Sequence, residues 1–216
     1  MSELAEDLLG VAPVAALSGP SHAEEVARGI PTAVVIGCRD HSKAVALQEL
    51  FMQPAFRVYT SEDIIGVELG GALKNVMALA AGVSDGIGFG DNSKAALITR
   101  GLAEMTRLGC ELGAKAETFA GLSGMGDLVV TCTSRHSRNR AVGERLGKGE
   151  SAESILASME QVAEGVWTCS TARSIAHAKG VDVPITDEVC AIVHEGKNPH
   201  EAVAALMTRD AKPETD

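Results

Sequence analysis

Hydrophobic and polar positions along the chain fall into two regions with different periodicity. In the first region, three short apolar runs bounded by Gly or Pro predict strands at 14–18, 32–37 and 56–60. A helical pattern over 41–53 separates the second and third runs, and one or two helical turns are expected at 23–28. This alternation of strand and helix is typical of a mostly parallel sheet covered by helices.

In the second region the strand pattern disappears, and apolar residues recur at the three- and four-residue spacing of a helix, first over 64–81. The glycine-rich segments 82–92 and 118–127 are predicted to be loops. The remaining helices are predicted at 93–112, 139–146, 151–159, 168–179, 186–195 and 198–207. We therefore divide the chain into a short α/β part (1–62) and a larger all-helical domain (63–216).

The first region is too small to be a sheet domain of its own. Two or three strands with one covering helix leave a face and an edge of the sheet exposed. We therefore expect these strands to be the last part of a larger sheet whose beginning is absent.

Composition narrows the class of protein. The 216 residues are 45% hydrophobic, so the chain can bury a core, and 29 acidic against 19 basic residues give a net charge of −10. This balance disfavours nucleic acid and anionic lipid as partners, because both are approached through positive fields. The first residues are acidic and no long uninterrupted apolar run is seen, which predicts a cytoplasmic protein without integral membrane contact.

The five cysteines are scattered without a C-x-x-C pair, as expected for free thiols in a reducing compartment. We find no histidine at a metal-ligand spacing and predict no metal site. The glycine-rich segments 86–90 and 121–126 follow helices rather than strands, so neither is a dinucleotide fingerprint.

Lys74 is a first candidate for chemistry, because it interrupts an otherwise apolar helix. Gly70 and Gly71 lie one turn before it and each costs the helix roughly 1 kcal/mol relative to Ala. A close approach by backbone or ligand would explain them. Lys74 then either contacts an anion or is a surface lysine that extends to solvent.

A second candidate is the segment 127–140, which gathers three arginines, a histidine and several hydroxyls. Ser137, Arg138 and Asn139 directly precede or open a helix, and their donors together with the helix dipole suit a phosphate group. A solvated turn with salt bridges fits the pattern equally well. Asp127 is either a partner for a lysine or a helix N-cap.

Two shorter motifs are ambiguous on their own. The segment 162–166 could be an ordinary surface helix start with Glu164 in solvent. The turn 18–22 follows a strand, and ligands bind at the carboxyl ends of strands in open α/β sheets.

Taken together, these motifs resemble the bacterial type of NAD(P)-dependent glycerol-3-phosphate dehydrogenases. The resemblance covers essentially the whole chain, with the motifs in family order and at family-like separations. The matching segments are 17–27, 68–78, 120–132, 137–140 and 162–166. The resemblance implies the C-terminal strands of a Rossmann-like α/β sheet followed by an all-α, 6-phosphogluconate-dehydrogenase-like helical domain. It makes 1–62 the C-terminal part of a dinucleotide-binding domain and 63–216 the substrate and catalytic domain.

The resemblance also implies an activity: interconversion of dihydroxyacetone phosphate and sn-glycerol 3-phosphate with NAD or NADP, feeding glycerophospholipid synthesis. Lys74 resembles the catalytic lysine and Asp127 the carboxylate beside it, both also touching substrate. The other residues similar to substrate contacts are Gly19, Ser21, Ser137, Arg138 and Asn139. Those similar to cofactor contacts are Ala23, Arg138, Val162 and Glu164.

The chain departs from the family pattern in three respects. It has no G-x-G-x-x-G motif, it lacks a further lysine that the family supplies from that region, and Trp167 stands where a basic residue is common. We therefore expect an N-terminally truncated chain whose own activity is open. NAD or NADP preference is also open, as is the choice between monomer and homodimer.

Two other functions compete with this interpretation. One is a non-catalytic helical remnant that binds phosphate esters or self-associates. The other is a different β-hydroxyacid-type dehydrogenase such as a ketopantoate reductase. The cluster 137–139 argues against the latter, because a phosphate-free substrate would not require it.

Overall fold

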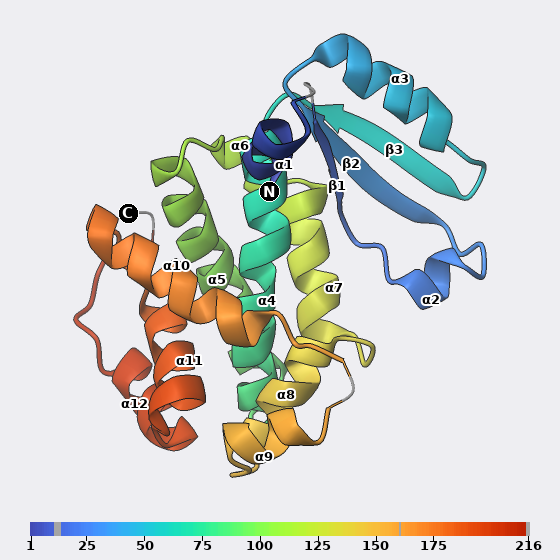
Figure 1. Ribbon diagram of the computed structural model, residues 1–216. Helices are drawn as coiled ribbons and strands as arrows, with labels where there is room; N and C mark the ends of the chain where they lie inside the picture. The colour runs from blue at the N-terminus through green and yellow to red at the C-terminus, as the bar shows by residue number, and fades with distance from the viewer. Residues whose placement is uncertain (11–13, 160, 215–216) are drawn as a thin grey trace.

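A computed structural model describes residues 1–10, 14–159 and 161–214, and Figure 1 shows a small sheet with one covering helix beside a larger group of helices. The elements up to the end of the sheet are α1 (Ser2–Leu9), β1 (Ala15–Ser18), α2 (Ala23–Val26), β2 (Thr32–Cys38), α3 (His41–Phe51) and β3 (Phe56–Ser61). The helices that follow are α4 (Ile64–Ile87), α5 (Asp91–Glu111), α6 (Ala116–Phe119), the π-helical turn η1 (Leu122–Gly126), α7 (Asp127–Thr133), α8 (Arg138–Gly147), α9 (Ala152–Ala157), α10 (Gly165–Lys179), α11 (Pro184–Glu195) and α12 (Pro199–Met207). Every strand and helix named in the sequence prediction is present. The helices α1, α6 and α7 were not predicted.

The sheet has the order β1-β2-β3, with β2 and β3 parallel and joined by α3. This β-α-β unit is the Rossmann-like part that the sequence predicted. The expectation of parallel strands is wrong for β1, which pairs antiparallel to β2 with Ser18 opposite Val35. A parallel connection usually carries a full helix across the sheet, whereas the connection 19–31 holds only the four-residue α2. The turn 18–22 therefore does not lie at an edge of parallel strand ends.

Helix α4 is the centre of the helical part, with α5, α7, α8 and α10 packed around it (Figure 1). Its Val76, Ala78 and Leu79 have no exposed surface. Among the described helices, α4 alone is long and apolar enough to cross a membrane, but 61% of its apolar window is buried inside the protein. Its apolar composition is accounted for by the helices around it.

The prediction of a loop over 82–92 is wrong, because α4 continues to Ile87. A Cβ on Gly82 would lie 2.0 Å from the Arg140 carbonyl oxygen of α8, and one on Gly143 would lie 2.1 Å from the Leu79 carbonyl oxygen of α4. The glycines thus let α4 and α8 approach backbone to backbone. The segment 118–127 is likewise not a plain loop, since it holds the end of α6 and all of η1.

Candidate active site

Lys74 and Asp127 form an ion pair between the middle of α4 and the first residue of α7. The Asp127 side chain is 4% exposed and that of Lys74 is 20% exposed. The Thr131 hydroxyl, one turn along α7, donates to the Asp127 carbonyl oxygen at 2.6 Å and lies 3.3 Å from Oδ1. Burial raises the pKa of Asp127, and the Lys74 ammonium acts against that rise. Of the alternatives for these residues, the structure has Asp127 as a lysine partner and Lys74 as an anion contact.

Gly70 marks a close approach, as its place in the sequence predicted. A Cβ on Gly70 would lie 2.4 Å from the carbonyl oxygen of Ser123 in η1. Any larger residue would push η1 away from α4 and displace Asp127, which follows η1 directly. Gly70, one turn before Lys74 on α4, therefore allows the approach of η1 that places the Asp127 carboxylate beside Lys74.

A buried amide network joins three helices beside Lys74. Asn139 Nδ2 of α8 donates to Asn75 Oδ1 of α4 at 2.9 Å, and Asn139 Oδ1 accepts from the Gly165 N–H of α10 at 2.9 Å. Asn75 Nδ2 in turn lies 3.3 Å from Glu164 Oε2. The sequence analysis missed Asn75, although a buried Asn beside Lys74 in an apolar helix was a signal that could have found it.

The first turn of α8 brings the predicted phosphate residues together. Ser137 is buried and caps the helix by accepting from the Arg140 N–H at 3.2 Å. Arg138 is exposed and donates through Nη1 to the Val162 carbonyl oxygen at 3.1 Å. Among the described residues, no carboxylate lies within 4.0 Å of the Arg138 guanidinium. The Asn139 side chain is engaged in the amide network, so its backbone N–H is the group left for an anion.

Arg140 differs from Arg138, although both belong to the basic segment. Its Nη1 lies 2.8 Å from Asp85 Oδ2 and 3.3 Å from Glu144 Oε2, and its Nε donates to the Ser134 carbonyl oxygen. Arg140 therefore joins α8 to the end of α4 through salt bridges, as the alternative interpretation of the segment 127–140 as a salt-bridged turn predicted. Arg138 makes no such ion pair with any described residue and is available to bind a ligand.

The turn 18–22 lies beside these residues, although not for the reason given by the parallel-sheet prediction. Gly19 is buried at φ +137°, where a side chain would be strained, and Ser21 Oγ donates to the Gly19 carbonyl oxygen at 3.0 Å. The His22 ring centroid is 5.9 Å from that of His136, which precedes α8. This contact places the end of the turn 18–22 beside the segment that leads into α8.

The predicted cofactor residues are less tightly grouped. Val162 and Glu164 are linked to the site through Arg138 and Asn75, as described above, and both are exposed. Ala23 is exposed at the first position of α2. Its role as a cofactor contact stays a prediction.

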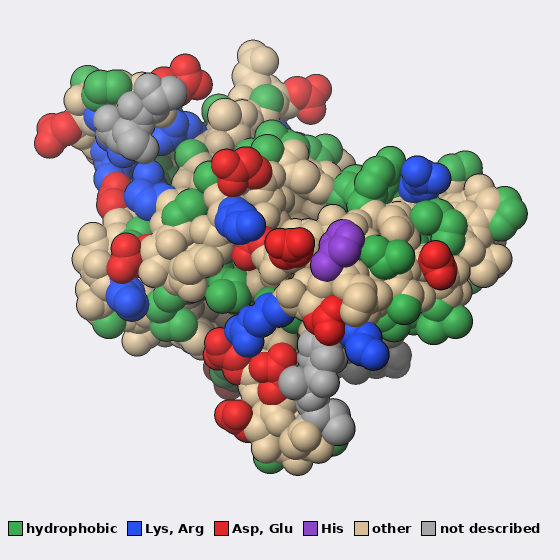
Figure 2. Space-filling model, turned by 90° about the horizontal axis from the view of Figure 1, so that it is seen from above, with side chains coloured by type: hydrophobic (Ala, Val, Ile, Leu, Met, Phe, Trp, Pro, Cys, Tyr) green, Lys and Arg blue, Asp and Glu red, His purple; other side chains and the backbone are tan. Residues whose placement is uncertain are grey.

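The candidate site lies outside two cavities of the described part of the chain. One, of about 680 Å³, is lined from α4, α5, α11 and α12, and the other, of about 600 Å³, lies between the sheet and η1. Lys74, Asp127 and Arg138 line neither of them. On the face seen in Figure 2, Lys and Arg side chains lie among Asp and Glu side chains, which suits a small anionic ligand better than a polyanion.

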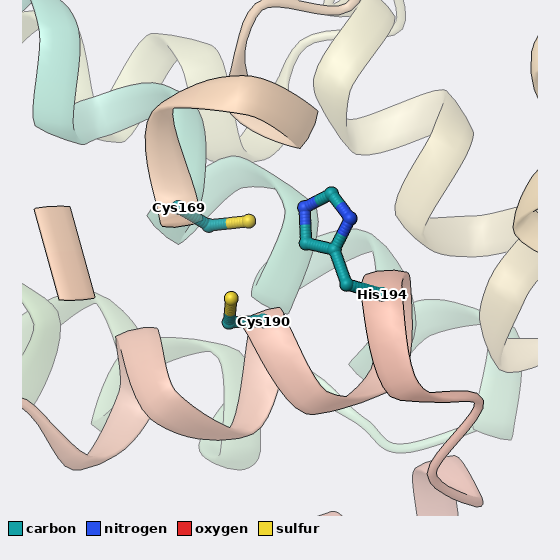
Figure 3. Close-up of side chains that lie close together, drawn as sticks. All are labelled: Cys169, Cys190 and His194. Carbon is teal, nitrogen blue, oxygen red and sulfur yellow. The ribbon is translucent and has the colours of Figure 1, made fainter. Parts of the chain in front are cut away.

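A second cluster of chemistry lies away from this site. Cys169 of α10 and Cys190 and His194 of α11 place their ligand atoms within 4.8 Å of one another, and Figure 3 shows the side chains converging. The statement that no histidine has a metal-ligand spacing was wrong, because Cys190 and His194 are four residues apart on one helix face. All five cysteines are free thiols, as predicted.

Comparison with known families is consistent with the geometry. The model for the NAD-dependent glycerol-3-phosphate dehydrogenase C-terminus matches residues 63–204, and the model for the N-terminus of the same family matches residues 1–44.

Known relatives carry the corresponding name. The chain is 57% identical over 200 residues to the glycerol-3-phosphate dehydrogenase [NAD(P)+] of Moorella thermoacetica, covering 93% of this chain and 60% of that protein. It is 58% identical over 198 residues to that of Geobacter sulfurreducens, covering 92% and 59%. The crystal structure of glycerol-3-phosphate dehydrogenase from Coxiella burnetii superposes with a TM-score of 0.92 at 43% identity, covering 96% of this chain and 64% of that one.

The chain thus spans about three fifths of the length of these relatives. The likeness extends over both of its parts, the sheet and the helices, and the family model for the helical part alone matches well over half of the residues. This chain belongs to the NAD-dependent glycerol-3-phosphate dehydrogenase family.

Proposed function

We propose that this chain carries the substrate and acid–base half of a glycerol-3-phosphate dehydrogenase, which interconverts dihydroxyacetone phosphate and sn-glycerol 3-phosphate. The observation that supports it best is the Lys74–Asp127 ion pair, set beside the first turn of α8 with the exposed Arg138. A proton donor and an anion site side by side are what reduction of a phosphorylated ketone requires. Membership of this family also favours this reaction over that of another β-hydroxyacid-type dehydrogenase.

NAD or NADP would supply or accept the hydride when bound. The residues present fit one side of such a nucleotide, since the Arg138 guanidinium contacts the Val162 carbonyl oxygen, and Val162 and Glu164 are both exposed. The sequence has no G-x-G-x-x-G segment, the motif that holds the diphosphate in many dinucleotide sites. We therefore assign Ala23, Arg138, Val162 and Glu164 to contacts with part of the cofactor.

In this proposal, Lys74 is the general acid and base for the oxygen atom on C2 of the substrate. As hydride reaches the carbonyl carbon, the Lys74 ammonium gives a proton to the carbonyl oxygen, and in the reverse direction the neutral amine takes the hydroxyl proton. Asp127 holds the Lys74 nitrogen in place and is itself held by Thr131. Because Asp127 is buried, water competes little for the ion pair.

The phosphate group would lie at the first turn of α8. There the backbone N–H groups of Arg138 and Asn139 have no intrahelical acceptor, and the Arg138 guanidinium can bind two phosphate oxygens. Ser137 orients that turn as its N-cap. Gly19 and Ser21 would close the site from the side of β1.

The first experiment mixes the chain with dihydroxyacetone phosphate and NADH or NADPH and follows nicotinamide absorbance. We expect Lys74→Ala to lower kcat about 10²- to 10⁴-fold, as for loss of a general acid. Lys94→Ala is the matched control, because its side chain is 22% exposed and paired with Asp85 at 2.8 Å. An equal effect of the two variants would contradict the role of Lys74.

A second experiment measures binding of glycerol 3-phosphate by calorimetry and does not depend on turnover. We expect Arg138→Ala to abolish binding and the neighbouring exposed Arg135→Ala to preserve it. Unchanged affinity in Arg138→Ala would remove the phosphate assignment. Phosphate-ester binding without any turnover in the unmodified chain would favour the non-catalytic remnant.

The remaining parts of the proposal concern the location, the binding partners and the oligomeric state of the protein. We propose a cytoplasmic protein with a small phosphate ester as its partner, without nucleic acid or integral membrane contact, and a homodimer as the state to test against a monomer. Size-exclusion chromatography with light scattering distinguishes the two.

A further inference from the structure

The cluster of Cys169, Cys190 and His194 does not belong to the candidate active site and needs an explanation of its own. The two cysteine side chains are fully buried between α10 and α11, while His194 is exposed at the outer end of α11. In Figure 3 the sulfur atom of Cys190 points toward Cys169, and the sulfur atom of Cys169 points toward the imidazole of His194. Two soft sulfur ligands and an imidazole therefore face one small volume with a route to solvent.

We propose that these three residues bind one Zn²⁺ ion that clamps α10 onto α11. Two thiolates around a tetrahedral zinc at 2.3 Å would be about 3.8 Å apart. The three ligand atoms already lie within 4.8 Å of one another, so side-chain adjustments of about an ångström complete the geometry. Two thiolates neutralise the charge of the ion, which lowers the cost of placing it in a buried site. The exposed side of His194 leaves the fourth position to water.

The hydrogen bonds now made by the cluster show what the ion would replace. Cys169 Sγ donates to the Val166 carbonyl oxygen at 3.2 Å, and His194 Nε2 lies 2.8 Å from the same oxygen. Binding through Nε2 moves the imidazole proton to Nδ1, and binding through sulfur releases one proton from each cysteine. Zn²⁺ uptake by the neutral-imidazole form thus releases two protons and involves no change of oxidation state.

The position of the cluster gives the ion a structural consequence. Cys169 lies one turn after Gly165, whose N–H is held by Asn139 in the amide network next to Lys74. Fixing Cys169 to Cys190 would hold the first turns of α10 against α11 and so steady the segment that carries Glu164. This inference does not depend on the proposed dehydrogenase activity.

The release of one proton from each cysteine gives the binding a pH dependence. The charged groups facing the two cysteines are Arg173, Glu195 and Asp187. Because two protons leave for each ion bound, we expect the affinity to rise about 100-fold from pH 7 to pH 8.

The test titrates the reduced, metal-free chain with Zn²⁺ against a chromophoric chelator. We expect one equivalent to bind with a Kd of about 1 µM or tighter at pH 7.5, and Co²⁺ to give a thiolate charge-transfer band. Cys169→Ser, Cys190→Ser and His194→Ala should each weaken binding at least about 100-fold. Cys110→Ser and His200→Ala, both at exposed positions, are the controls and should bind as the unmodified chain does.

The experiment distinguishes loss of the metal site from a failure of a variant to fold. His194 is exposed, so His194→Ala tests the site even if a buried cysteine variant fails to fold, and the Co²⁺ spectrum of the unmodified chain needs no variant at all. Zn²⁺ should also raise the Tm of the unmodified chain and leave that of His194→Ala unchanged. Binding weaker than about 1 µM, a Co²⁺ spectrum without thiolate bands, or full affinity in His194→Ala would each overturn the proposal.

Discussion

Replacing Asn139 by Ala tests the amide network on which the candidate site is built. Asn139 is 8% exposed, and its amide makes two hydrogen bonds of 2.9 Å, one to Asn75 Oδ1 and one from the Gly165 N–H. The second bond replaces the usual N-cap of α10, because Glu164 at that position makes no side-chain cap. The substitution therefore leaves one buried acceptor and one buried helix-end donor without partners.

The expected cost follows from these two orphaned groups. Each buried polar group left without a partner costs about 1–3 kcal/mol, so Asn139→Ala should lower the free energy of unfolding by about 2–6 kcal/mol. That is a large share of the roughly 5–15 kcal/mol typical of a folded protein. Asn198→Ala is the control, since Asn198 caps the exposed start of α12 through the His200 N–H at 2.9 Å. Loss of such a cap costs about 1 kcal/mol.

The assay is urea unfolding followed by far-UV circular dichroism and by the fluorescence of Trp167, the single tryptophan. Trp167 lies in the first turn of α10, so its signal reports the helix that Asn139 caps. Coincident transitions test whether unfolding is two-state, and an unchanged m-value assigns the effect to the native state. Asn75→Ala should be less than additive with Asn139→Ala. A loss in Asn139→Ala no larger than that in Asn198→Ala would refute the reasoning.

Three further predictions concern stability. Burial raises the pKa of Asp127, so the native state holds the Asp127 proton more tightly than the unfolded state does. The free energy of unfolding, relative to that of Asp127→Asn, should therefore fall as the pH rises above about 4. An increase measured by urea unfolding across that range would contradict this. Gly143→Ala places a Cβ 2.1 Å from the Leu79 carbonyl oxygen and should cost about 1–3 kcal/mol, while Gly90→Ala, with open space around it, should change stability by less than about 1 kcal/mol. Glu104 is 2% exposed and accepts from the N–H groups of Ile185 and Thr186, so thermal unfolding of Glu104→Ala should show a loss of at least about 2 kcal/mol.

Local periodicity predicted most of the strands and helices but not how they pack against one another. The apolar spacing in 64–81 identified α4 correctly, because a buried helix repeats its core positions every three or four residues. The same criterion failed at Gly82, where glycine indicates a loop by propensity but is required by the approach of α8. Direction in the sheet failed for a similar reason, since a strand's own sequence does not encode which way its neighbour runs.

For the candidate site as well, single residues could be predicted from the sequence, whereas most contacts between distant segments could not. Lys74 and Asp127 were found because each is unusual in its own segment. Their pairing across 53 residues was expected from the family resemblance alone, because no local pattern links the two segments. The amide network joins residues 64 and 26 positions apart and left only the buried Asn75 as a local trace. In the Cys–His cluster, the four-residue spacing of Cys190 and His194 is visible in the sequence. The third member, Cys169, lies 21 residues before Cys190 on another helix, so no local pattern could predict it.

The net charge of −10 and an anionic substrate are compatible because the candidate site is governed by local charges. At physiological ionic strength, charges more than about 8 Å apart at the surface are largely screened from one another. Around Lys74 the chain places the first turns of α7, α8 and α10, each the positive end of a helix dipole. Arg138 adds a cation there, and the buried Asp127 is already neutralised by Lys74. The helix N-termini and Arg138 therefore contribute a positive potential there, and Glu164, 3.3 Å from Asn75 Nδ2, is the carboxylate that opposes it. These local groups, and not the net charge of the chain, decide whether a small anion binds.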